Sequence, residues 1–136
     1  MHKKIVLWIS IVVPSITLLI VGATILFNRT QPSGKEIAIA GVLVPSAKRA
    51  ISNPQQTVFY EASRDAVIIN AYGFMEPDSQ RKVIDELRAA LTNDMHEVKI
   101  KVLFFPPREY LVERESDGRQ VSRLKKMDAI RQVGLN

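Results

Sequence analysis

The chain has 136 residues, of which 46% are hydrophobic and 24% are charged, with a formal net charge of +5. It contains no cysteine, which excludes both a disulfide framework and a thiolate metal site. The basic residues are mixed with acidic ones and are not gathered in a patch interleaved with aromatics, so the composition does not indicate nucleic-acid binding.

The longest apolar stretch, residues 5–27, contains no charged residue and is predicted to be a transmembrane helix. As a helix its 23 residues would be about 34 Å long, enough to cross a hydrocarbon core of about 30 Å. A cleaved signal peptide is the alternative, because the small residues Gly22 and Ala23 resemble a peptidase site. The apolar run continues past that site to Phe27, which favours a permanent anchor.

The charges on either side of this stretch indicate its orientation. Lys3 and Lys4 precede it within a short tail, residues 1–4, whereas Arg29 and Lys35 follow it. Basic residues beside a span favour the cytoplasmic side, and the amino terminus adds to the bias before the span. We therefore predict a single-pass protein of the cell membrane with a cytoplasmic N-terminus. The C-terminal domain would be extracytoplasmic, and periplasmic if the source is a Gram-negative bacterium.

One side of the predicted span carries mostly small or hydroxyl residues. They recur at i, i+4, i+7, i+11 and i+14, and are Ser10, Pro14, Thr17, Val21 and Thr24. At about 100° per residue these positions share one helix face. Such residues mark contact faces between helices in lipid, which predicts packing against another span in a homo-oligomer or a larger complex. In the alternative interpretation, the hydroxyl groups bond to their own helix and face lipid.

The residues that follow the predicted span are sufficient for one small domain with a single core. Residues 28–36 are predicted to be a polar linker containing proline and glycine, and residues 37–136 to be the domain. The apolar residues 37–44 suit either a strand or, together with residues 47–51, a short helix, and the sequence leaves both open.

Two strands joined by a tight turn are predicted next. Residues 57–62 and 66–72 are rich in β-branched and aromatic side chains, and the polar residues 63–65 between them suit a hairpin connection. Gly73 ends the second run.

The clearest predicted element is an amphipathic helix that begins at Pro77, a residue that suits the first helical position. Its apolar stripe consists of Val83, Ile84, Leu87, Ala90 and Leu91. Residues 98–105 then predict a strand, and the strand–helix–strand order implies a right-handed crossover. The stripe is expected to face the apolar residues of the two strands, namely Val67, Ile69, Ile100 and Val102.

The C-terminal third predicts a hairpin and a tail. Residues 110–115 and 120–124 flank Asp117 and Gly118, a strong hairpin signal, and residues 123–133 are predicted to form a short basic helix. The fold class is therefore α+β: one N-terminal transmembrane helix followed by a small mixed β-sheet domain with one main amphipathic helix packed on one face.

Two candidate contact sites lie in the predicted domain. A basic cluster is interpreted either as a solvated helix face or as a contact for anionic lipid headgroups or an acidic partner. Its members are Arg123, Lys125, Lys126 and Arg131. The adjacent Phe104 and Phe105 are expected to point to opposite faces of their strand, so that one fills the core. The other is covered by the C-terminal tail or contacts a partner.

The sequence contains no recognisable catalytic constellation. Its histidines are His2 and His96, whereas a metal site needs three or four converging ligands. Glu109, Glu113 and Glu115 share a strand face and are interpreted as solvated hairpin surface. We therefore predict that the protein is not an enzyme and has no cofactor, no metal and no nucleic-acid partner. It is expected to be a structural or protein-interaction component of a membrane or envelope complex, with a membrane-tethered ligand-binding or regulatory domain as the alternative.

Overall fold

The computed structural model describes residues 16–24 and 31–136. The chain divides into two compact units, residues 1–31 and residues 32–136. None of the helices in the described part combines the length and the apolarity needed to cross a membrane. The remainder of the predicted span, residues 5–15 and 25–27, lies outside the described residues, and so do Ser10 and Pro14 of the predicted contact face.

Residues 16–24 of the first unit are helical. Thr24 donates a hydrogen bond from its hydroxyl to the carbonyl of Ile20, at 2.8 Å. This is the intrahelical bond expected of a threonine that satisfies its hydroxyl within its own helix. The predicted contact with a second span remains a prediction.

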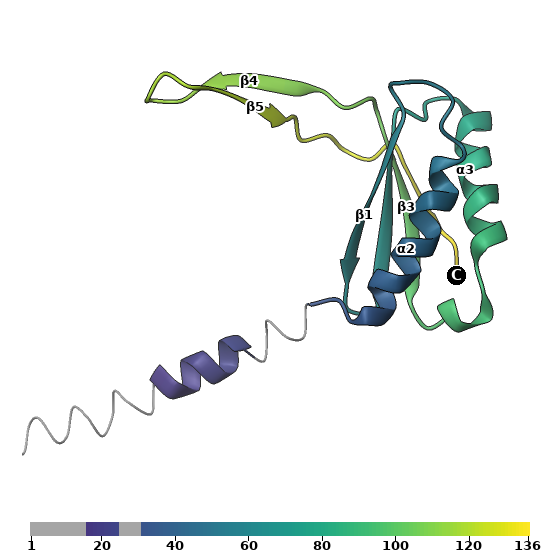
Figure 1. Cartoon of the computed structure of the whole chain (residues 1–136), viewed down its shortest axis with the longest axis horizontal. Helices are drawn as coiled ribbons and strands as arrows, with labels where there is room; N and C mark the ends of the chain where they lie inside the picture. Colours follow the sequence, from purple (N-terminus) through teal and green to yellow (C-terminus); the bar gives the residue numbers. More distant parts are fainter. Residues whose placement is uncertain (1–15, 25–30) are drawn as a thin grey trace, which may run out of the picture. The chain divides into compact units, whose positions relative to one another are not determined.

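The second unit has a four-stranded mixed sheet, two helices that pack on one of its faces, and a separate two-stranded ribbon (Figure 1). Its elements are α2 (Gly34–Lys48), β1 (Thr57–Ser63), β2 (Ala66–Tyr72), α3 (Pro77–Ala90), a 3-10 turn (Asn93–Met95), β3 (Lys99–Phe105), β4 (Tyr110–Arg114), β5 (Gln120–Leu124) and β6 (Arg131–Gly134). The sheet has the order β1-β2-β3-β6, and β4 pairs with β5 alone. β2 and β3 are parallel, whereas the other pairs are antiparallel. The α+β prediction is confirmed, including the parallel pair on either side of α3.

The segment that suited either a strand or a helix is the helix α2, which begins three residues before the predicted start of the domain. Its buried positions follow helical spacing and are Glu36, Ile39, Ala40, Leu43, Ser46 and Ala47. Ile37 and Val42 lie on the other side with about half of their surface exposed, 49% and 48%. The prediction of one main helix on the sheet is therefore wrong, because α2 also packs against β1, β2 and α3.

The predicted basic helix of residues 123–133 is also wrong. Arg123 lies in β5, Lys125 and Lys126 lie in the following loop, and Arg131 begins β6. β6 pairs with the edge of β3, with Val133 opposite Val102 and Arg131 opposite Phe104. This pairing satisfies backbone groups that β3 would otherwise leave open at the edge of the sheet, which a short tail helix would not do.

The hydrophobic core lies between the two helices and one sheet face. The predicted contact between the α3 stripe and the strands is confirmed, since Val83, Leu87, Val67, Ile69, Ile100 and Val102 all belong to this core. Phe104 from β3 and Phe74, just after β2, are fully buried in the same core.

A buried carboxylate ties the start of α2 to the β1–β2 turn. Glu36 accepts hydrogen bonds from the hydroxyl and the backbone N–H of Ser33, and from the backbone N–H of Asp65 at 3.0 Å. Asp65 has a positive φ of 62°, and its carbonyl accepts a bond from the Lys99 N–H at 2.9 Å. The pKa of Glu36 is lowered from 4.5 to about 2, mainly because the carboxylate accepts a hydrogen bond from the Ser33 hydroxyl, and next because it accepts one from the Asp65 N–H.

We expect Glu36→Gln to lower the melting temperature at pH 7, because glutamine keeps the shape but weakens three charge-assisted hydrogen bonds. The folded-state pKa is lowered, so the carboxylate stabilises the fold above its ordinary pKa of 4.5. That stabilisation is lost as the pH falls from about 4.5 through about 2, where the variant and the parent should converge. Thermal unfolding across this pH range measures the difference. Glu97→Gln, at an exposed carboxylate paired with Lys35, is the control and should have little effect.

Candidate functional site

The sheet face opposite the helices carries an aromatic cluster at one end. Successive rows across β1, β2 and β3 are Thr57, Tyr72 and Phe105, followed by Phe59, Asn70 and Leu103. Tyr72 stacks on Phe105 with ring centroids 4.8 Å apart and an interplanar angle of 16°. Phe59 lies edge-on to Tyr72 at 6.2 Å. The prediction that Phe104 and Phe105 diverge is confirmed, and Phe105 is the member of the pair that lies on this open face.

The loop after β3 brings an arginine onto this cluster. Pro106 and Pro107 directly follow β3 and end it, because proline has no N–H to donate to a strand ladder, and Arg108 comes next. The guanidinium carbon of Arg108 lies 4.5 Å from the ring centroid of Phe59, 5.1 Å from that of Tyr110 and 5.9 Å from that of Tyr72. These distances allow cation–π attraction, which offsets part of the cost of moving the charge out of water.

A small pocket of about 160 Å³ opens beside this arginine and is called here the arginine pocket. It is lined by Phe59, Tyr60, Glu61, Asn70, Tyr72, Arg108 and Leu124. Asn70 is only 6% exposed, and its side chain makes no hydrogen bond within the described part of the chain. Among the described residues, two buried side-chain atoms lack a partner, Nε of Arg108 and Oγ1 of Thr57, and both belong to this end of the open face.

The β4–β5 ribbon projects away from the rest of the domain (Figure 1). Tyr110 pairs with Leu124 and Val112 with Ser122, which places Tyr110, Val112 and Leu124 on one side of the ribbon, called here its apolar face. Val112 is 65% exposed, and the other two residues are also exposed. Because Tyr110 lies under Arg108 and Leu124 lines the arginine pocket, the apolar face and the pocket are continuous.

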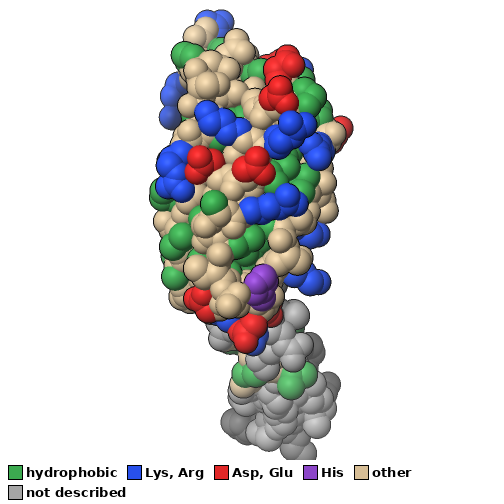
Figure 2. Space-filling model, turned by 90° about the vertical axis from the view of Figure 1, so that its right-hand side faces the viewer, with side chains coloured by type: hydrophobic (Ala, Val, Ile, Leu, Met, Phe, Trp, Pro, Cys, Tyr) green, Lys and Arg blue, Asp and Glu red, His purple; other side chains and the backbone are tan. Residues whose placement is uncertain are grey.

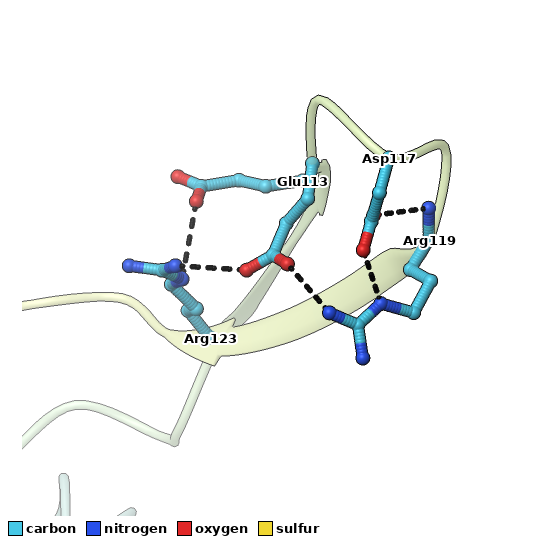
Figure 3. Close-up of polar contacts among 5 residues, drawn as sticks. Glu113, Asp117, Arg119 and Arg123 are labelled. Carbon is cyan, nitrogen blue, oxygen red and sulfur yellow. Dashed lines mark hydrogen bonds and ion pairs between the residues drawn. The ribbon is translucent and has the colours of Figure 1, made fainter.

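The other side of the ribbon carries ion pairs (Figure 3). Arg123 lies 3.3 Å from Glu113 and 3.4 Å from Glu115, while Arg119 pairs with Asp117 at 2.6 Å and with Glu115 at 3.6 Å. All of these groups are at least one-third exposed, so each pair contributes little to stability, but together they favour the hairpin register. The interpretation of the glutamates as solvated hairpin surface fits this arrangement.

The residues of the predicted basic cluster lie on β5, on the loop after it and on β6, and three of them have polar partners of their own. Arg123 is engaged on the ribbon, Lys125 pairs with Glu109 at 2.9 Å, and Arg131 donates to Gln80 Oε1 at 3.1 Å. Lys126 is exposed in the loop. A role of these four residues in lipid or partner binding remains a prediction.

The helix-covered side of the domain has a different character. Lys and Arg side chains are interspersed with Asp and Glu on it (Figure 2). A wide hollow of about 520 Å³ lies on α3 and is lined by Asp78, Arg81, Lys82, Asp85, Glu86 and Ala89. Arg81 pairs with Asp78, and Glu86 pairs with Arg49 of the adjoining turn. Because its charges are mixed and largely solvated, this hollow offers little to select a ligand. Within residues 16–24 and 31–136, no group of acids or histidines has a geometry that would hold a metal ion.

Sequence reasoning did not find Arg108 or Asn70. Phe59 and Tyr72 come from β1 and β2, so the strand register brings them together, whereas Tyr110 follows Arg108 by two residues. The available signal was an arginine directly after two prolines and two residues before Tyr110, which is weak by itself. The chain matches no protein-family model, no curated protein and no solved structure.

Proposed function

We propose that the chain is a single-pass, membrane-anchored interaction protein whose domain contacts a protein partner through the β4–β5 ribbon. The observation that carries the proposal is the exposed apolar face of this ribbon, formed by Tyr110, Val112 and Leu124. A two-stranded ribbon is marginally stable in water unless its apolar side is covered. Within the described part of the chain, β4 and β5 pair with each other only, so a partner is the natural cover.

The ribbon also has two strand edges with open backbone groups. Exposed edges of this kind readily pair with another chain. The arginine pocket extends the same surface onto the domain body through Leu124 and Arg108. A partner could therefore contact the ribbon and the open sheet face together.

The membrane anchor in this proposal is the apolar stretch of residues 5–27. Its support is the absence of charge along the stretch, together with exposed apolar side chains in the helical residues 16–24, such as Leu18 and Leu19. The bias of Lys3 and Lys4 supports a cytoplasmic N-terminus and an extracytoplasmic domain. The ribbon would then reach a partner in the compartment outside the cytoplasm.

The absence of cysteine from the chain allows one experiment to test the partner and the orientation. Val112→Cys places a unique thiol on the apolar face of the ribbon, and Ala89→Cys places one on the exposed side of α3 as the control. Both variants are labelled with a membrane-impermeant maleimide, in intact cells and after purification. We expect both thiols to react in cells, with the ribbon thiol of Val112→Cys reacting at least about fivefold more slowly there than in the purified protein. The helix thiol of Ala89→Cys should react equally in the two settings.

Equal rates at position 112 in cells and in the purified protein would contradict a ribbon partner. Absence of labelling at both positions in intact cells would contradict an extracytoplasmic domain.

A second candidate function is a membrane-tethered ligand-binding domain. The specific observation in its favour is the arginine pocket, where Arg108 and Asn70 present polar groups without partners in the described chain. Its volume of about 160 Å³ is well below the roughly 300–1,000 Å³ typical of pockets that enclose a whole small molecule. The pocket therefore suits one side chain of a larger partner better than an independent ligand.

A further inference from the structure

We propose that the arginine pocket binds the carboxylate of an acidic side chain that a protein partner presents to the domain. The inference rests on the proposed interaction function and names the chemistry that the partner must supply. Arg108 would pair with the carboxylate, and the Asn70 amide would donate a second hydrogen bond.

Arg108 brings a positive charge into this pocket. Its side chain is half-buried and its Nε is fully buried, yet it forms no ion pair or hydrogen bond within the described residues. By contrast, the ribbon arginines Arg119 and Arg123 each pair with two carboxylates. A partly desolvated guanidinium without an acceptor is costly, and a carboxylate is the acceptor that its planar fork fits best.

Asn70 supplies a second donor to the same pocket, and its side-chain amide has no hydrogen-bond partner within the described part of the chain. The residue is 6% exposed, but its amide atoms are not among the buried atoms that lack a partner, so the amide still contacts solvent and can donate to a ligand in the pocket. Two donors that line one cavity without partners are what a carboxylate with two oxygens can satisfy.

Glu61 also lines the pocket, and its negative charge must be considered when the charge of the ligand is inferred. It lies on the edge strand β1 and is exposed, so water solvates its charge. The aromatic faces of Phe59, Tyr72 and Tyr110 that a cationic ligand would use already hold the Arg108 guanidinium. The pocket therefore favours an anion, and Glu61 should weaken that binding modestly through repulsion.

Small capped amino acids test this pocket on the full-length ¹⁵N-labelled chain in detergent micelles, without the partner. The probes are N-acetyl-glutamate methylamide and its neutral analogue N-acetyl-glutamine methylamide. N-acetyl-alanine supplies a free main-chain carboxylate instead. We expect saturable NMR shifts of the Asn70 side-chain amide and the Arg108 Nε–H with the glutamate probe. The glutamine probe should bind about tenfold more weakly, because it lacks the charge-assisted pair.

Three variants sharpen the test. Arg108→Lys keeps the charge but removes the planar guanidinium, and should weaken binding of the glutamate probe about tenfold. Glu61→Gln removes the repulsion between Glu61 and the probe, and should strengthen binding of the glutamate probe about twofold. Arg88→Gln, at an exposed arginine on α3, is the control and should leave the affinity unchanged.

Equal shifts with the glutamate and glutamine probes, or equal affinity in Arg108→Lys, would overturn the proposal. Tighter binding of N-acetyl-alanine would overturn the assignment to a side-chain carboxylate. If the probes fail while the thiol of Val112→Cys is still protected in cells, only the pocket proposal is overturned, since that protection reports the ribbon partner independently.

Discussion

Replacing Phe104 with alanine should lower the free energy of unfolding by about 3–5 kcal/mol. The Phe104 ring is fully buried in the core between the sheet and the two helices, so its removal leaves a cavity that the packed helices fill only in part. A small domain has only about 5–15 kcal/mol of stability, so the variant should melt far below the parent. Urea unfolding followed by circular dichroism measures the change.

Phe105→Ala is the matched control, because it removes the same ring from the next residue of β3 on the opposite sheet face. Phe105 is half-buried and packs on Tyr72 at 4.8 Å, so the expected loss is smaller, about 1–2 kcal/mol. Because the Phe105 ring supports the Tyr72 ring, its removal should also disturb the aromatic cluster around Arg108. Equal losses in the two variants would mean that the two sheet faces are buried alike, contrary to the structure.

The elements with strong local signals could be predicted from the sequence. The α3 helix begins at Pro77 as expected, and the β1–β2 and β4–β5 hairpins lie at the predicted turns. Each of these depends on neighbouring residues: a proline at the first helical position, or a turn sequence between two strand-forming runs.

The elements that the sequence left open or predicted wrongly are those with conflicting local signals. In α2, Ile37 and Val42 are apolar although they lie on the exposed side of the helix. Apolar residues therefore occur on both sides of α2, and the helical periodicity cannot be recognised in the sequence. The strand β6 has four residues, and its Val133 fits the helical spacing of Leu124, Met127 and Ile130 as well as it fits a strand. Pairing with β3, a long-range contact, decides between the two structures.

The arginine pocket could not be predicted, because no local pattern contains it. Strand alternation with Ile69 assigns Asn70 to the open face, but only the register supplies its neighbours, Phe59 on one side and Leu103 on the other. Arg108 acquires its environment from the loop geometry after Pro107. A site assembled from three strands and a loop follows from the tertiary fold, whereas Phe104 and Phe105 could be assigned to opposite faces from strand alternation alone.

Among the glycines of the described residues, Gly73 should be the one whose replacement by alanine destabilises the fold most. We expect Gly73→Ala to lower the free energy of unfolding by at least about 2 kcal/mol. Gly73 has a φ of +79°, which disfavours any residue with a Cβ, and an added Cβ would lie 2.3 Å from the Gln55 carbonyl oxygen. The clash is with backbone, so the loop that contains Gln55 must move. The Gly73 N–H also donates to the Phe105 carbonyl at 2.9 Å, next to the stacked pair of Tyr72 and Phe105.

Gly118→Ala separates the conformational cost from the steric one. Gly118 has a similar φ of +85° in the ribbon turn, but an added Cβ would meet nothing within 4 Å. Gly118→Ala should therefore lower the free energy of unfolding by about 1 kcal/mol, the cost of placing alanine in the left-handed conformation. For a domain of this size the melting temperature should fall by roughly 5 °C in Gly118→Ala and by about 10 °C or more in Gly73→Ala. Equal shifts would mean that the Gln55 loop yields freely, and Gly73 would then be required only for its backbone conformation.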